Sequence, residues 1–274
     1  MNEQLVEAVR ARRTILFVGA GVSRSLGLPS WNELIAKMAV DLEFDPDVFR
    51  GYGGNLDLAE YYQLTKKTIG PLRAELDRLW HQDEAKVDSS QIYQAIVNLR
   101  CPTIYTTNYD RWLEIAFRRG GKKAVKIANV GDFTQIEDGT PQIVKLHGDF
   151  DDDASLVLTE ASYFDRLSFE SPLDIKLRSD SIGRTILFIG YSITDINVRL
   201  LLYKLHMLWT KSAFSDARPE SFIFLQTPNP VQEAILKNRG ITPIISENDD
   251  PTTGLGTFLE RVVREAFGTT PGKT

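Results

Sequence analysis

The sequence contains a single cysteine, Cys101, among 274 residues, so the chain by itself builds neither a disulfide framework nor a cysteine-based zinc site. Basic residues are not in excess, because 32 Lys and Arg stand against 37 Asp and Glu and the formal net charge is −5. Proteins that wrap duplex DNA usually present a basic face. We therefore expect no direct contact with nucleic acid.

Long apolar runs are also missing. No hydrophobic segment reaches the length that crosses a membrane, and the N-terminal residues lack the apolar core of a secretory signal peptide. A lone cysteine is typical of proteins in a reducing compartment. These features predict a soluble, cytoplasmic protein without a membrane anchor.

The sequence does contain a regular alternation of short β-rich runs and helical stretches. The β-rich runs are residues 15–18, 103–106, 142–146, 185–189, 222–225 and 242–245. Several are apolar at consecutive positions, as in strands that are covered on both faces, and residues 186–189 are the clearest case. The pattern predicts an α/β fold, a Rossmann-like parallel sheet with helices on both faces.

About eighty residues separate the first two of these runs, and they show helical patterns without a convincing strand. The helical patterns cover residues 31–42, 56–66, 71–80 and 91–99. A crossover between parallel strands needs far fewer residues. We therefore expect residues 1–274 to form a single domain in which roughly 40–90 are an inserted helical lobe.

A glycine-rich turn follows the first predicted strand and contains Gly19, Ala20, Gly21 and Ser23. Such turns bind nucleotide phosphates, since glycines let the backbone approach a pyrophosphate and free amides at a helix start donate to it. Arg24 stands where the dinucleotide fingerprint has its third glycine, which disfavours an ordinary dehydrogenase site. The alternative is a turn that only connects a strand to a helix, with Ser30 as a helix cap.

Polar residues end the second predicted strand. Thr107, Asn108 and Asp110 lie between the strand at 103–106 and a helical run at 111–117. Ligands of open α/β sheets bind outside the carboxyl ends of strands, so these side chains lie where chemistry is expected. The structural alternative is that Thr107 or Asn108 caps the following helix.

A histidine, His147, ends the third predicted strand, and the flexible residue Gly148 follows it. A neutral imidazole accepts a proton from a ribose hydroxyl or a water molecule near pH 7. The two other histidines are His81, in a polar run, and His206, within a predicted helix where a packing or surface role is expected.

The strand at 185–189 ends in a further glycine turn that contains Gly190, Ser192 and Asp195. This turn is suited to hold the second half of a dinucleotide. Ser192 and Asp195 are equally suited to cap the helix that follows.

Four motifs occur in a fixed order: G-A-G-V-S with G-L-P, then T-N-Y-D, K-L-H-G-D and G-Y-S-x-x-D. Together they resemble the sirtuin-like family of bacterial anti-phage defence systems, over about residues 14–205. The resemblance implies NAD as substrate, with a Rossmann-like site at Gly19, Ala20, Gly21 and Ser23. It places Asn108, Asp110 and His147 around the nicotinamide ribose.

The resemblance also implies that Asn108 and His147 are catalytic. Asn108 would position a water molecule or a ribose hydroxyl, and Asp110 would hold the nicotinamide amide. His147 would act as general base while an oxocarbenium-like centre forms. The products would be nicotinamide and ADP-ribose.

Deacylating sirtuins are similar to the chain at the NAD turn, but they carry a four-cysteine zinc module and usually a Phe-Arg pair after G-I-P. Here Cys101 is alone, and Ser30 and Trp31 follow Gly-Leu-Pro. These differences favour hydrolysis of NAD, without zinc, over protein deacylation. The alternatives are a non-catalytic module that senses NAD or ADP-ribose, and an ADP-ribosyltransferase or deacylase with the same glycosidic chemistry.

An unregulated NAD hydrolase would deplete the NAD of its own cell, so the resemblance implies a control partner or an inhibited homo-oligomer. Relatives of this size resemble partners of a ring-forming HerA-type ATPase or of a short Argonaute. We favour the ATPase.

Overall fold

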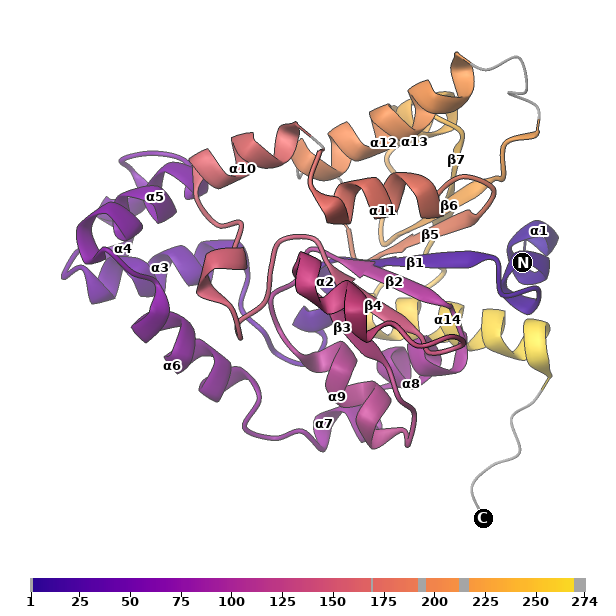
Figure 1. Ribbon diagram of the computed structural model, residues 1–274, viewed down its shortest axis with the longest axis horizontal. Helices are drawn as coiled ribbons and strands as arrows, with labels where there is room; N and C mark the ends of the chain where they lie inside the picture. The colour runs from indigo at the N-terminus through magenta and orange to yellow at the C-terminus, as the bar shows by residue number, and fades with distance from the viewer. Residues whose placement is uncertain (1, 169, 192–195, 212–216, 269–274) are drawn as a thin grey trace.

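The computed structural model describes residues 2–168, 170–191, 196–211 and 217–268. Its centre is a seven-stranded parallel sheet in the order β3-β4-β2-β1-β5-β6-β7 (Figure 1). The strands are β1 (Thr14–Val18), β2 (Thr103–Thr106), β3 (Val125–Ile127), β4 (Gln142–Lys145), β5 (Thr185–Ile189), β6 (Ser221–Leu225) and β7 (Ile241–Ile245). All six predicted strands are present, and the prediction of an α/β parallel sheet is confirmed.

Strand β3 was not predicted from the sequence. It has three residues, and the half-buried Lys126 separates its two buried residues, Val125 and Ile127. The strand lies at the edge of the sheet and pairs with β4. Two apolar side chains around a lysine form too short a pattern to be recognised as a strand.

Helices cover both faces of the sheet (Figure 1). One face carries α1 (Glu3–Arg10), α8 (Gln91–Asn98), α9 (Trp112–Arg119) and α14 (Pro251–Phe267), and the other carries α11 (Pro172–Asp180), α12 (Ile196–Thr210) and α13 (Pro230–Asn238). Strand side chains alternate between two hydrophobic clusters, so Leu16 faces the first set of helices and Phe17 the second. Because both faces are covered, β1, β2, β5 and β6 are buried at every position.

Four helices between β1 and β2 surround a third hydrophobic cluster. They are α3 (Trp31–Asp41), α4 (Pro46–Arg50), α5 (Asn55–Lys66) and α6 (Gly70–Trp80), and α7 (Lys86–Ser89) leads from them to α8. The cluster contains Leu34, Phe49, Tyr62 and Leu76, together with Phe150 from the loop after β4. The helices that share it run from Trp31 to Trp80, whereas α8 packs under the sheet. An inserted lobe at roughly 40–90 stays a prediction.

The helix α10 (Glu160–Leu167) lies between α5 of this group and α12, which covers the sheet (Figure 1). It approaches both α5 and α12, and the Ala161 amide at its start donates to Glu60 Oε2 at 2.9 Å. No helix in the described part of the chain is both long and apolar enough to cross a bilayer.

The order of the strands reverses at β1. The chain proceeds from β1 toward β2, β4 and β3 on one side and then returns to β5, β6 and β7 on the other. The turns after β1 and β5 meet there, since Gly19 N donates to Ile189 O and Gly21 N to Gly190 O, both at 2.9 Å. A Cβ atom on Gly190 would lie 2.8 Å from Val22 N, and its φ is +71°. Only glycine suits this contact.

Replacing Gly190 by alanine tests this contact. We expect Gly190→Ala to lower the free energy of unfolding by about 2–4 kcal/mol, because a left-handed φ and a steric clash both oppose the methyl group. Gly183 also has a positive φ, +79°, but a Cβ there meets no atom within 4 Å. Gly183→Ala should therefore cost only about 1 kcal/mol. Urea unfolding followed by circular dichroism measures both, and equal losses would contradict the packing argument.

Candidate functional site

A cavity of about 490 Å³ lies where the strand order reverses, outside the carboxyl ends of β1, β2, β4 and β5. Open α/β sheets bind ligands at this position. The turns of the sheet form a polar side of the cavity, and α3, α5 and α6 form an apolar side with residues such as Trp31, Leu56 and Trp80. Its volume is typical of a site for a small molecule or cofactor.

Most residues predicted for the site line this cavity. They are Ala20, Ser23, Thr107, Asn108, Asp110, His147 and Gly190. Gly19 and Gly21 instead pack against the turn after β5. Ser192 and Asp195 lie outside the described residues. The fold thus brings Asn108 and His147, which are far apart in the sequence, to one cavity.

The backbone amides of the glycine turn differ from what the sequence led us to expect. Gly19 N donates to Ile189 O at the end of β5, Gly21 N donates to Gly190 O in the turn after it, and Val22 N donates to Gly19 O at 3.1 Å. These amides are engaged within the protein and are not free for a phosphate. The glycines therefore serve the packing of two turns, and a phosphate at this place needs other donors.

Both amide hydrogens of Asn108 are engaged. Its Nδ2 donates to Gly19 O at 3.1 Å and to Ser23 Oγ at 2.8 Å. Ser23 Oγ in turn donates to Asp110 Oδ2 at 2.6 Å. With both N–H groups used, the Oδ1 atom of Asn108 is the group left to accept a hydrogen bond from a ligand.

Neither Thr107 nor Asn108 caps the next helix, so the structural alternative for these two residues is wrong. The N-cap of α9 is Arg111, which makes no side-chain capping bond, and Asp110 Oδ1 accepts from Trp112 N at 3.0 Å. The Thr107 hydroxyl lies 3.1 Å from the hydroxyl of Tyr191. Ser30 does cap α3, together with Glu33.

His147 is only 3% exposed, and its ring meets the ring of Tyr163 on α10 edge-on, with centroids 5.2 Å apart. Burial, and to a smaller extent the nearby charge of Arg166, lower the pKa of His147 from its usual 6.5 to about 3. The imidazole is therefore neutral at pH 7, so one of its ring nitrogens is an acceptor.

A buried charge network beneath the cavity was not identified from the sequence. Lys145 and Asp149 are 0% and 1% exposed, and their side chains form an ion pair. Burial opposes the charge of Lys145, but Glu114 and Asp149 raise the pKa of its ammonium above the usual value. In the sequence, only the K-L-H-G-D motif pointed to this network, because it contains both Lys145 and Asp149. Opposite charges four residues apart are normally found at an exposed strand end, so the motif did not indicate a buried pair.

The apolar side of the cavity was also missed. Trp80 from α6 and Tyr163 from α10 line it, and the Trp80 ring lies 5.2 Å from that of Phe150. Their positions depend on how the helices between β1 and β2 fold back over the sheet, which no local pattern indicates. In the sequence, Trp31 was distinguished only because Ser30 and Trp31 follow Gly-Leu-Pro, where deacylating sirtuins usually have a Phe-Arg pair.

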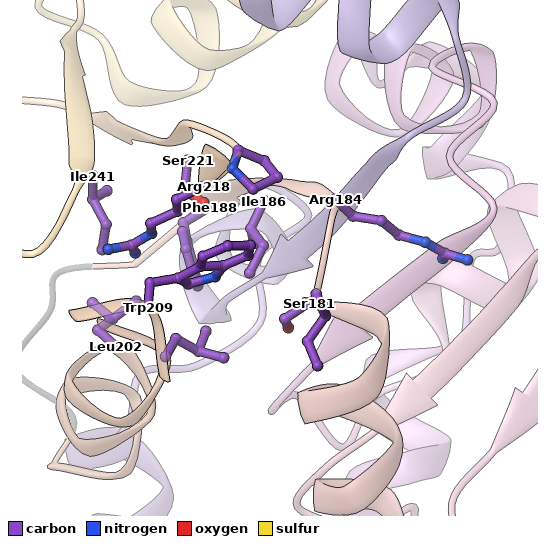
Figure 2. A pocket seen from close by; sticks show the side chains of 12 residues that line it. Ser181, Arg184, Ile186, Phe188, Leu202, Trp209, Arg218, Ser221 and Ile241 are labelled. Atoms are coloured by element: carbon purple, nitrogen blue, oxygen red, sulfur yellow. The ribbon is translucent and has the colours of Figure 1, made fainter. Parts of the chain in front are cut away.

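A second crevice, of about 20 Å³, lies at the amino ends of β5, β6 and β7, with Ser181, Trp209 and Arg218 among its lining residues (Figure 2). Asn108 and His147 lie at the carboxyl ends of the strands, so this crevice is at the opposite end of the sheet. Its volume suits about one water molecule. Across the described ranges, no group of three or more His, Cys, Asp or Glu side chains is arranged to hold a metal ion.

The strand order and the cavity define a doubly wound α/β protein with a polar site at the reversal of the sheet. The SIR2-like domain family matches residues 102–244. The chain belongs to this SIR2-like family.

Several named relatives are similar to the chain. The NAD(+) hydrolase ThsA of Enterococcus faecium is 30% identical over 203 residues, which cover 72% of this chain and 40% of that protein. ThsA of Acinetobacter baumannii (strain 532279) is 26% identical over 76% of this chain and 42% of its own length. Defense-associated sirtuin 2 of Bacillus subtilis is 27% identical over 87% of this chain and 24% of that protein. The chain thus spans less than half the length of these relatives.

Two solved structures also align with the chain along nearly its whole length. A chain from a structure on sirtuin substrate affinity has a TM-score of 0.45 and 13% identity, and covers 98% of this chain and 100% of itself. Sir2Tm bound to a propionylated peptide has a TM-score of 0.40 and 14% identity, and the alignment covers 97% of this chain and 99% of that chain.

The neutral state of buried His147 makes stability depend on pH. Between pH 6.5 and about 3 the unfolded chain binds a proton that the folded protein excludes, so stability falls as the pH drops below 6.5. We expect this histidine to account for a loss of about 2 kcal/mol between pH 7.5 and pH 5. His147→Gln should remove that loss and His206→Gln should keep it, as measured by urea unfolding at each pH. The same loss in both variants would contradict the burial of a neutral His147.

Proposed function

We propose that the protein cleaves NAD+ to nicotinamide and ADP-ribose, with Asn108 and His147 as catalytic residues. One observation carries the proposal: Asn108, whose amide is held in one orientation, and the neutral, buried His147 line the same cavity. Two relatives named NAD(+) hydrolase, aligned over about three quarters of the chain, support it.

In the proposed reaction the bond between C1′ of the ribose and the nicotinamide nitrogen breaks. The electron pair of this bond goes to the pyridinium nitrogen, which becomes neutral, and an oxocarbenium-like ribose remains. The oxygen of a water molecule forms the new bond to C1′, His147 accepts a hydrogen bond from that water as general base, and the proton of the water is released to solvent. No oxidant, reductant or metal ion is required by this balance.

The fixed amide of Asn108 gives it a definite role in that reaction. Because Gly19 O and Ser23 Oγ hold its two N–H groups, Oδ1 faces a ligand only as an acceptor. It accepts from a ribose hydroxyl or from the attacking water, and holds that group in line with C1′. Ser23 and Asp110 act behind it by holding the amide in this orientation.

The remaining predicted contacts also belong to this proposal. Ala20, Thr107, Asp110 and Gly190 line the cavity beside the two catalytic residues. We assign Asp110 to the nicotinamide amide and the turn after β5 to the adenylate half of the dinucleotide, which lies across the reversal of the sheet. Zinc has no part in this assignment, since the sequence has a single cysteine.

We also propose that the protein is the effector subunit of an anti-phage complex that depletes cytoplasmic NAD+. The relative named defense-associated sirtuin 2 supports the context. The assembly has two parts, a homo-oligomer of this chain and a regulatory partner, for which a HerA-type ATPase is preferred over a short Argonaute.

Substitution of the two catalytic residues tests the reaction. The protein is incubated with NAD+, alone and with its partner and DNA, and nicotinamide, ADP-ribose and modified protein are quantified by chromatography and mass spectrometry. Asn108→Ala and His147→Ala should each lower nicotinamide release by about 100-fold or more, since each removes a positioned catalytic group. His206→Ala, which alters a histidine outside the cavity, should behave as wild type.

The products separate the candidate functions. Free ADP-ribose in step with nicotinamide supports hydrolysis, whereas ADP-ribose attached to protein shows transfer to another acceptor. If the wild type binds NAD+ but releases no nicotinamide under any of these conditions, the proposed enzymatic activity is wrong. The hypothesis that is then left is a non-catalytic module that senses NAD.

A further inference from the structure

Lys145 joins the two loops that carry the catalytic residues. It is the last residue of β4 and pairs in register with Thr106, the last residue of β2. The loop after β2 contains Asn108, and the loop after β4 contains His147. Lys145 therefore stands at the point from which both loops leave the sheet.

The ammonium group of Lys145 has three hydrogens, and each has an acceptor. Nζ donates to Tyr109 O at 2.9 Å and to Asp110 O at 2.7 Å, in the loop after β2. It also donates to Asp149 Oδ2, in the loop after β4. A lysine ammonium is a donor only, so these bonds use its full capacity.

One buried charge thus binds both loops, beside the stacking of the Tyr109 ring on that of Phe150, with centroids 5.8 Å apart. Lys145 is fully buried and does not line the cavity. Glu114 of α9 lies 3.3 Å from the ammonium and adds a second carboxylate. Charge-assisted hydrogen bonds are about twice as strong as neutral ones, and here no water competes for the donor.

From this geometry we infer that Lys145 is a positioning residue for the proposed reaction: its ammonium fixes the Asn108 loop relative to the His147 loop, with Asp149 as the connection on the His147 side. The inference rests on the proposed function of the cavity. It assigns to a buried lysine a role in turnover and not only in stability.

The side chain of Asp149 offers a matched pair of variants. Asp149 and Asp151 both accept from Lys126, but only Asp149 accepts from Lys145. Asp149 is buried, whereas the Asp151 side chain is 52% exposed. Asp149→Asn weakens the buried connection between the loops. Asp151→Asn removes an exposed carboxylate, whose contact with the loop after β2 is an exposed ion pair to Arg111 at 3.8 Å and is expected to contribute little.

The main test is Lys145→Met, assayed with NAD+ at a temperature where circular dichroism shows the variant to be folded. We expect kcat to fall about 100-fold, because a displacement of the order of 1 Å between reacting groups has this effect. KM should stay within about threefold, since Lys145 makes no contact to the cavity. A purely structural lysine would lower the melting temperature and leave kcat of the folded protein unchanged.

The aspartate variants test the role of Lys145 even if Lys145→Met does not fold. Asp149→Asn should lower kcat about tenfold, and Asp151→Asn should match the wild type. The double variant Lys145→Met/Asp149→Asn should be no slower than Lys145→Met, since both changes act on one connection. A kcat within threefold of wild type in folded Lys145→Met, or equal kcat in the two aspartate variants, overturns the inference.

Hydrogen exchange separates this inference from the proposed function. Amides in residues 107–112 and 146–151 should exchange faster together in Asp149→Asn than in Asp151→Asn. If the wild type releases no nicotinamide, the proposed function fails and this exchange result alone decides whether Lys145 joins the loops. Unchanged exchange in both segments overturns the inference.

Discussion

The contact between the turns after β1 and β5 is the constraint on which the site depends. Gly19 and Gly21 donate to the backbone at the end of β5 and in the turn after it, and Gly190 lies too close to Val22 for any side chain. This contact closes the point where the strand order reverses. It also sets the carbonyl of Gly19 where it accepts from Asn108. The glycine turn thus builds the polar side of the cavity from backbone groups, and Asn108 is oriented by the same turn.

Burial gives the neighbouring groups different charge states. His147 is enclosed by α10 and is neutral, because burial opposes its protonated form. Lys145 is more deeply enclosed and remains charged, since Glu114 and Asp149 raise its pKa against the effect of burial. The end of β4 therefore carries two different groups: the neutral acceptor His147 in the cavity and the charged ammonium of Lys145 beneath it. The helices from Trp31 to Trp80 complete the enclosure with apolar side chains.

Local patterns in the sequence predicted the sheet and the polar side of the site, because both depend on strands. The buried parallel strands appear as unbroken apolar runs such as residues 185–189, and strand ends placed Asn108 and His147 at one edge. What could not be predicted depends on contacts between distant segments: the engaged amides of Gly19 and Gly21, the packing of Trp80 and Tyr163, and the bonds of Lys145 to the next loop. Strand β3 escaped because its pattern is too short.

We propose that NAD+ is cleaved in the cavity between Asn108 and His147. A crystal structure of Asn108→Ala, grown with NAD+ so that the uncleaved dinucleotide accumulates, tests it most directly. We expect the nicotinamide ribose in this cavity, with a ribose hydroxyl or an ordered water within hydrogen-bond distance of His147. A nucleotide bound elsewhere, such as at the crevice lined by Ser181, Trp209 and Arg218, with the cavity empty, would contradict this proposal.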